Sequence, residues 1–182
     1  MSVTGTDGRK VFSVDVSCDS PGEFSVIVPA KSLKNIQHMK SQTFKIAANA
    51  RSITFSDGTT SYTSSLLQGR FPDVNKLLKK PDDAQIIACE TSVLLDGARG
   101  VIWDDGERSF LIDSDGITSA DGQRQYAADL SDEFDQRQVS IEHFEPLVKS
   151  FESVVVYNAG GDSPLYVELG DSARGMIATM GK

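Results

Sequence analysis

The chain has 182 residues, of which 39% are hydrophobic and 24% are charged, and its formal net charge at pH 7 is −8. This length allows one large domain or two small ones with a real hydrophobic core, and the composition is that of an ordinary soluble protein. The negative charge argues against a protein that grips nucleic acid with its whole surface, although it allows one basic face on an acidic body.

The two cysteines, Cys18 and Cys89, lie far apart and form neither a CxxC motif nor a His–Cys spacing typical of metal sites. No signal peptide and no apolar run of membrane-spanning length is visible. We therefore expect a soluble, reduced, intracellular protein with no membrane contact, metal ion or cofactor.

The first part of the chain predicts one strand and then a unit of strand, helix and three strands. The first strand is expected at 11–16, after the turn Thr6-Asp7-Gly8, and it needs a pairing partner from elsewhere. The unit follows, with a helix at 30–40 and strands at 24–29, 43–48, 52–56 and 61–66.

The expected helix at 30–40 is amphipathic. Ala30, Leu33 and Ile36 share an apolar stripe. Lys31, Lys34 and His38 share the opposite stripe, which without further context is more often a solvated face than a nucleic-acid surface.

Residues 66–78, with the sequence LLQGRFPDVNKLL, predict a rigid bend at the end of a strand. Pro72 fixes its own φ and disfavours helix at Phe71, and one helical turn follows at 74–78. A polar linker at 79–84 comes next. On local grounds alone the stretch is an interdomain turn with a small apolar ledge.

The same order of one strand, one helix and three strands then occurs twice more along the chain. The second unit has strands at 85–89, 108–112, 117–120 and 125–130 and a helix at 92–103, capped by Thr91 or Ser92. The third has strands at 138–141, 154–158, 165–169 and 175–180 and a helix at 142–153 that Pro146 should kink or shorten. Three βαβββ units of about 45 residues predict an α+β fold built from an internal repeat.

An enzyme is not favoured, because no GxSxG, HExxH or P-loop motif occurs. His143 precedes an apolar Phe on a helix, which favours a structural or surface role. The aspartate-rich segment 113–121 has its glycine too early for an EF-hand and is better explained as a hairpin turn. A binding protein remains the stronger interpretation.

Four stretches resemble one known family, the bacterial sliding clamp or β subunit of DNA polymerase III. They are TGTDGRKVFSV at 4–14, SVIVPAKSLKNI at 25–36, LLQGRFPDVNKLL at 66–78 and ARGVI at 98–102. The resemblance implies a DNA clamp fold of one and a half domains: the C-terminal half of a middle domain at 1–78, a linker at 79–84 and a C-terminal domain at 85–182. The family's first domain and half of its second have no counterpart here.

The resemblance implies a ring that encircles double-stranded DNA, tethers a DNA polymerase and a clamp loader through short linear motifs, and has no catalytic activity. Such a ring is a cytoplasmic, nucleoid-associated homo-oligomer of a bacterial or phage-infected cell. Binding to DNA is topological, so weakly basic inner helices suffice, because tight phosphate contacts would stop sliding. The side chains that would face the DNA are Lys31, Lys34, His38, Lys40, Arg99 and Lys149.

The family also has a pocket for partner peptides. The matching residues here are Thr6, Gly8, Arg9, Lys10, Val11, Pro72, Lys76, Leu77, Met176, Ile177, Ala178, Thr179 and Met180. Apolar walls with flexible methionines suit extended peptides of several sequences. Arg9-Lys10 replaces the family's usual His-Arg pair, and Thr179 stands where a proline is common.

Two assemblies are open. Without the first domain the usual two-subunit ring cannot form, which leaves an interaction module or fragment that binds peptides without closing on DNA. Alternatively, the half-domains pair between chains, and four chains of three units would supply the twelve units of a family ring.

Overall fold

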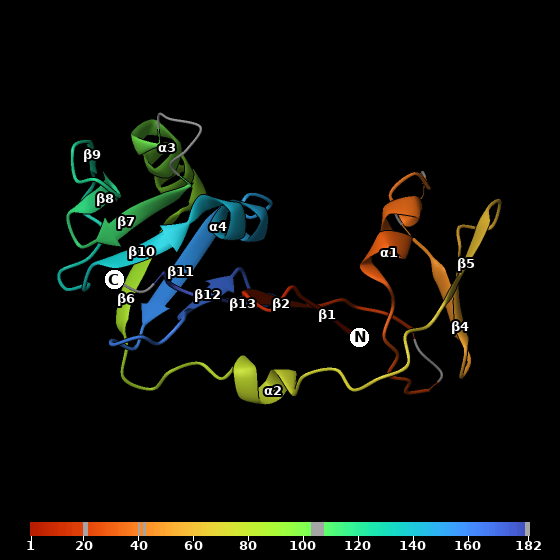
Figure 1. Cartoon of the computed structure of the whole chain (residues 1–182). Helices are drawn as coiled ribbons and strands as arrows, with labels where there is room; N and C mark the ends of the chain where they lie inside the picture. Colours follow the sequence, from red (N-terminus) through yellow and green to blue (C-terminus); the bar gives the residue numbers. More distant parts are fainter. Residues whose placement is uncertain (20–21, 40, 42, 103–107, 181–182) are drawn as a thin grey trace. The chain divides into compact units, whose positions relative to one another are not determined.

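The computed structural model describes residues 1–182 except 20–21, 40, 42, 103–107 and 181–182 (Figure 1). The chain forms two compact units. The larger comprises Met1–Cys18 and Asp73–Lys182, and the smaller comprises Asp19–Pro72.

The larger unit has two antiparallel sheets. The strands of the six-stranded sheet, in spatial order, are β1 (Ser2–Thr6), β2 (Lys10–Asp15), β13 (Ala173–Ile177), β12 (Leu165–Leu169), β11 (Ser153–Asn158) and β6 (Gln85–Glu90). Those of the four-stranded sheet are β10 (Arg137–Ser140), β7 (Ser109–Asp113), β8 (Gly116–Ser119) and β9 (Gln125–Ala127). The helices are α2 (Val74–Leu77), α3 (Thr91–Val101) and α4 (Ile141–Val148), and Figure 1 shows α2 on the side of the six-stranded sheet away from α3 and α4.

The second and third predicted βαβββ units are confirmed, and they exchange their first strands. β6 does not pair within its own repeat but with β11 of the next, while β10 pairs with β7 of the preceding repeat. The N–H of Thr91, the first residue of α3, donates to Glu152 O, and that of Ile141, the first residue of α4, donates to Arg108 O, both at 2.9 Å. Each repeat therefore completes the sheet of the other.

The main hydrophobic core lies where α3 and α4 meet the two sheets. Leu94 of α3 and Phe144 of α4 are 0% and 1% exposed, and the Phe144 ring packs edge-on against Phe110 at 5.6 Å between centroids. An ion pair at 2.6 Å joins Arg99 of α3 to Glu145 of α4. Both helices therefore contribute to one core, and α3 and α4 also contact each other through this ion pair.

The expected strand at 11–16 is β2, and its two neighbours were not predicted. β1 pairs with β2 over five residues, and β13 pairs with its other edge from Ala173↔Val14 to Ile177↔Lys10. Residues 1–18 are therefore hydrogen-bonded into the sheet of the C-terminal part of the chain. The division at 79–84 stays a prediction.

The smaller unit contains α1 (Ala30–Ile36) and a three-stranded antiparallel sheet in the order β3 (Lys45–Ala48), β4 (Ser52–Ser56) and β5 (Ser61–Ser65). The predicted strand at 24–29 is wrong as a regular strand, because only an isolated bridge joins Ile27 to Leu67. The helix predicted at 30–40 ends at Ile36.

Other boundaries also differ. α3 begins at Thr91 with Glu90 at its N-cap and no side-chain cap, so the expected capping by Thr91 or Ser92 is wrong. α4 ends at Val148 rather than 153, with Pro146 inside it. The strand expected at 125–130 ends at Ala127, and the predicted end of α3 at 103 lies outside the described residues.

The two cysteine thiols differ in exposure. Cys18 is exposed, whereas Cys89 is half-buried in β6. Burial, followed by the charge of Glu90, raises the pKa of Cys89 from 9.0 to about 11. Because the thiolate is the reactive form, we expect Cys89 to react about 100-fold more slowly than a thiol of ordinary pKa. Absorbance measurements with Ellman's reagent on a Cys18→Ser variant test this, with the unfolded protein as control; equal rates would contradict it.

Candidate peptide-binding groove

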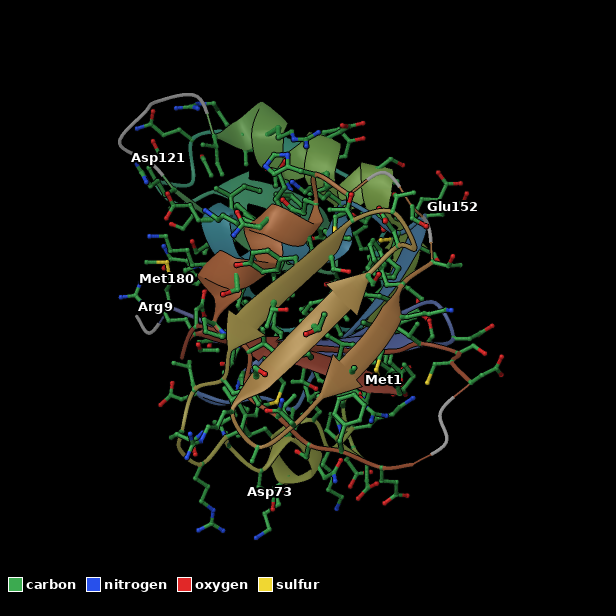
Figure 2. All side chains as sticks on the ribbon, turned by 90° about the vertical axis from the view of Figure 1, so that its right-hand side faces the viewer. Met1, Arg9, Asp73, Asp121, Glu152 and Met180 are labelled. Carbon is green, nitrogen blue, oxygen red and sulfur yellow. The ribbon has the colours of Figure 1, made fainter. Side chains whose placement is uncertain are left out.

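Three of the predicted pocket segments come together in the larger unit. The turn between β1 and β2 holds Thr6–Lys10, and β13 lies beside β2 with Met176 opposite Val11. The backbone N–H of Ala178 donates to Arg9 O at 2.8 Å, which extends this pairing beyond β13. Arg9 and Met180 lie near each other (Figure 2).

The turn is fixed by its own polar groups. Burial works against ionisation of the Asp7 carboxyl, but hydrogen bonds from the N–H groups of Arg9 and Lys10, both at 2.9 Å, outweigh it and lower the Asp7 pKa. Thr6 Oγ1 donates to Lys10 O at 2.9 Å, and Gly8 has φ +87°, which favours glycine. The turn therefore holds the exposed Arg9 at a defined position.

The helical turn after the predicted bend packs on the outer face of the same sheet. Leu78, Tyr157 and Tyr166 form a small buried cluster there, and side chains packed against it include Val11, Val74 and Met176. Leu77 of α2 is 40% exposed, and so is not buried in the cluster. The ledge predicted at 74–78 thus lies beside Val11 and Met176, as expected for one surface.

Some predicted pocket residues lie elsewhere. Ile177 is 0% exposed, in the main core, so its side chain cannot contact a peptide. Lys10 shares that face, donates to Glu142 O at 3.1 Å and pairs with Asp7 at 3.5 Å. Lys76 pairs with Asp73 at 3.7 Å at the exposed end of α2. Pro72 is the last residue of the smaller unit, whereas the other predicted pocket residues belong to the larger unit.

A cleft of about 850 Å³ adjoins the C-terminal segment and was not predicted. Its lining residues include Arg9, Arg108, Arg124, Asp121, Glu142, His143 and Ala178–Met180. Arg108 is ion-paired with Glu142, and Arg124 donates to Val101 O at 2.8 Å. Among the described residues, Arg9 has no side-chain partner, and the buried Nδ1 of His143 has none either.

Arg137 anchors the C-terminal segment. It is 8% exposed, and its guanidinium donates to the carbonyl oxygens of Gly161 and Ser163 and, at 3.0 Å, to Thr179 Oγ1. Sequence analysis missed it, although a signal existed: Arg137 and Val139 are two apart in a strand, so both face the core.

Lys80, in the predicted linker, is also tied to the sheet. Its Nζ donates to Tyr157 Oη at 2.7 Å and Glu168 Oε2 at 3.2 Å, and it lies 4.4 Å from the Tyr157 ring centroid. The hydrogen bond with Tyr157 is the largest of the effects that raise the Lys80 pKa. This contact secures the chain after α2.

The predicted DNA-facing residues divide between the units. Lys31 and Lys34 are exposed on α1, His38 is exposed just after it, and Lys40 lies outside the described residues. In the larger unit, Arg99 and Lys149 line a shallow cleft with Glu90, Asp96 and Glu152, and Arg99 is paired with Glu145. The lining of this cleft thus holds two cations and three carboxylates, and the DNA-facing role of Arg99 and Lys149 stays a prediction.

Within the described part of the chain, no group of three or more His, Cys, Asp or Glu side chains could hold a metal ion. None of the helices in that part is long and apolar enough to cross a membrane.

Comparisons with known proteins bear on this arrangement. The family model for the DNA polymerase III beta subunit, central domain, matches residues 2–73. The beta sliding clamp of Chlamydia muridarum is 29% identical over 90 residues, which are 47% of this chain and 25% of that protein.

Solved structures cover the whole chain. The DNA polymerase III subunit beta of Pseudomonas aeruginosa aligns with a TM-score of 0.80 at 17% identity, over 100% of this chain and 55% of that one. The beta subunit of DNA polymerase III from Thermotoga maritima aligns with a TM-score of 0.80 at 15% identity, over 100% of this chain and 54% of that one. The Helicobacter pylori beta clamp bound to DNA ligase peptide gives 0.78 at 14%, over the same shares.

The fold is therefore that of a DNA clamp, as predicted. The resemblance to the bacterial sliding clamps, the β subunits of DNA polymerase III, is confirmed. The chain spans about half the length of the clamp structures that it matches.

Proposed function

We propose that the chain is part of a DNA sliding clamp, a non-catalytic processivity factor that holds replication and repair proteins through a peptide-binding groove. The observation that carries the proposal is that Val11 of β2, Val74 of α2 and Met176 of β13, which are far apart in sequence, pack against one buried cluster of Leu78, Tyr157 and Tyr166. The fold that the chain shares with sliding clamps supports it.

The groove suits an extended peptide with apolar anchors. Leu77 and Met180 are 40% and 48% exposed, and Met176 and Val11 are half-buried and pack against the tyrosine cluster. Methionine side chains adapt to different apolar partners.

The neighbouring cleft adds a charge preference. The exposed Arg9 guanidinium has no side-chain partner among the described residues, and Arg108 and Arg124 line the same cleft. Because charge-assisted hydrogen bonds to carboxylates are the stronger ones, an acidic residue beside the apolar anchors should favour binding.

Fluorescence anisotropy tests the groove. A labelled extended peptide with two apolar anchors and one adjacent aspartate should bind, and its Asp→Asn analogue should bind more weakly, with a difference that shrinks in high salt. A scrambled peptide of the same composition is the control. Equal binding of all three peptides would refute the groove.

For DNA, we propose topological binding, with Lys31, Lys34, His38, Lys40, Arg99 and Lys149 facing the duplex in a homo-oligomeric ring in the cytoplasm, at the nucleoid. The partners would be double-stranded DNA, a DNA polymerase and a clamp loader. The acidic body and the few inner cations suit sliding rather than tight contact.

The second candidate is a clamp-fold module that binds peptides without closing on DNA. The pairing of Arg99 with Glu145 favours it, because that pair uses up one of the inner cations. Retention on circular DNA separates the two. A ring is lost when the circle is cut, whereas surface binding is unchanged by cutting.

Lys31 and Lys34 carry a prediction of their own. If the ring is topological, Lys31→Ala with Lys34→Ala should leave retention on closed circles nearly unchanged, while simple surface binding should weaken, with about two units lost from the salt slope. Gel-filtration retention at several salt concentrations measures this, with Lys76→Ala with Lys79→Ala as a matched control. Complete loss of retention on circles would contradict topological binding.

A further inference from the structure

The smaller unit contains a βαβββ repeat whose helix is uncovered. α1 has no buried residue, and its fourth residue, Leu33, is 41% exposed. The fourth residues of α3 and α4, Leu94 and Phe144, are 0% and 1% exposed. The same position is therefore core in two repeats and surface in the third.

The unit's strands are also incomplete in a matching way. In the larger unit, the first strand of each repeat pairs with the second strand of the other. In the smaller unit, residues 24–29 form only the bridge from Ile27 to Leu67, and β3 is an edge strand of its sheet. In the described part of the smaller unit, the segment in the place of the first strand therefore has no ladder partner. One edge of the second strand, β3, has no neighbouring strand either.

We propose that two copies of this chain pair through their smaller units by reciprocal strand exchange: residues 24–28 of each copy extend the sheet of the other at β3, and the two α1 helices pack together through Leu33. A surface that holds both halves of the exchange is self-complementary, as a two-fold symmetric interface requires. The proposal rests on the fold and not on the proposed binding of peptides or DNA.

The larger unit defines the register of this exchange. The residue before each helix pairs with the first residue of the other repeat's second strand, Glu90 with Ser153 and Ser140 with Ser109. By the same rule, Pro29 lies opposite Lys45 of the second copy. Ile27 then lies opposite Ala47, and Val28 opposite Ile46.

The hydrogen-bond pattern agrees with that register. Leu67 N–H donates to Ile27 O at 2.9 Å, so the polar groups of Val26 and Val28 point to the other edge of the segment. In the larger unit, the N–H of Ile141 donates to Arg108 O, so the pair two residues earlier, Val139 with Phe110, is also a hydrogen-bonded pair. Val139 is the counterpart of Val28. Pro29, which lacks an N–H, falls at a position that needs no donor.

The faces agree as well. Val26, Val28, Ile46 and Ala48 are half-buried, whereas Lys45 and Ala47 are exposed. In the larger unit, Val139 corresponds to Val28 and Phe110 to Ile46. Both Val139 and Phe110 are 0% exposed and lie in the core. The exchange would therefore close an apolar layer that is half-finished in one copy.

The helix orientation leaves the required flank free. Ser32 and Asn35 hydrogen-bond to Ser64 and Tyr62 of the unit's own sheet, both at 2.8 Å. Leu33 lies on a neighbouring flank of α1 and Lys31 on the other. α1 contains no acidic residue, so the contact between two α1 helices rests on apolar side chains.

Disulfide trapping tests the register. In a Cys18→Ser, Cys89→Ala background, Ile27→Cys with Ala47→Cys should form a covalent dimer under mild oxidation, because a non-hydrogen-bonded antiparallel pair brings Cβ atoms within disulfide reach. Each single cysteine and the out-of-register pair Ile27→Cys with Ser61→Cys are controls. Equal trapping of the controls, or no trapped dimer, overturns the proposal.

Sedimentation equilibrium tests the helix contact. Leu33→Asp should weaken self-association by at least about tenfold, while Leu77→Asp, an equally exposed leucine in the larger unit, should not. A monomeric wild type, or equal effects of the two variants, overturns the proposal. So does a crosslink that forms only after a separate clamp polypeptide is added, because that result assigns the face to another occupant.

Discussion

Replacing Arg137 by leucine is expected to destabilise the larger unit by about 2–4 kcal/mol and to abolish most peptide capture. The substitution leaves the carbonyl oxygens of Gly161 and Ser163 without their donor in a part-buried site. It also releases Thr179, and with it the segment that borders the groove. Urea denaturation measures the first effect and peptide anisotropy the second.

Arg137→Lys separates charge from geometry. A lysine keeps the positive charge but has no planar fork to reach three acceptors, so it should recover only part of the stability. Arg51→Leu, an exposed arginine of the smaller unit, is the surface control. Unchanged peptide affinity in a folded Arg137→Leu protein would show that the C-terminal segment does not need this anchor.

The repeated order of strand, helix and three strands was predictable because it depends on local sequence patterns. Alternating apolar residues, Asp-Gly turns and helical stripes recur with the same order, and these depend on neighbours in sequence. The exchange of β6 and β10 was not predictable, because alternation shows which residues face a core and not which strand lies beside them. β1 was missed for a different reason: the turn that joins it to β2 was recognised, but Ser2–Thr6 contains only one large apolar residue and so shows no strand-like alternation.

The error at 24–29 is informative for the same reason. Its apolar residues have the right spacing for a strand, but a strand exists only where a neighbour accepts and donates hydrogen bonds. In the larger unit, the other repeat supplies that neighbour. In the smaller unit no described residue does, apart from the bridge at Leu67.

The groove was predicted by resemblance, and local chemistry alone would not have found it. Its three segments are far apart in sequence, and only the pairing of β2 with β13 brings them together. The resemblance also carried over Ile177, whose side chain faces the main core. Period-two alternation beside the half-buried Met176 could have separated these two residues.

Replacing Leu77 by aspartate should weaken peptide binding by roughly 10- to 100-fold without unfolding the protein. Burying a leucine side chain against a ligand contributes about 1.5–3 kcal/mol, and the aspartate adds a charge that an apolar anchor would have to desolvate. Because Leu77 is 40% exposed and lies outside the tyrosine cluster, the unfolding free energy should change little.

Leu33→Asp makes this prediction specific. Leu33 is 41% exposed, nearly the same as Leu77, but it lies in the smaller unit, so its replacement should leave peptide affinity unchanged. Each variant is therefore the control for the other. Leu77→Asp should weaken only peptide binding, and Leu33→Asp should weaken only self-association. If both substitutions reduced peptide affinity alike, binding would depend on the assembly and not on the surface formed by α2, β2 and β13.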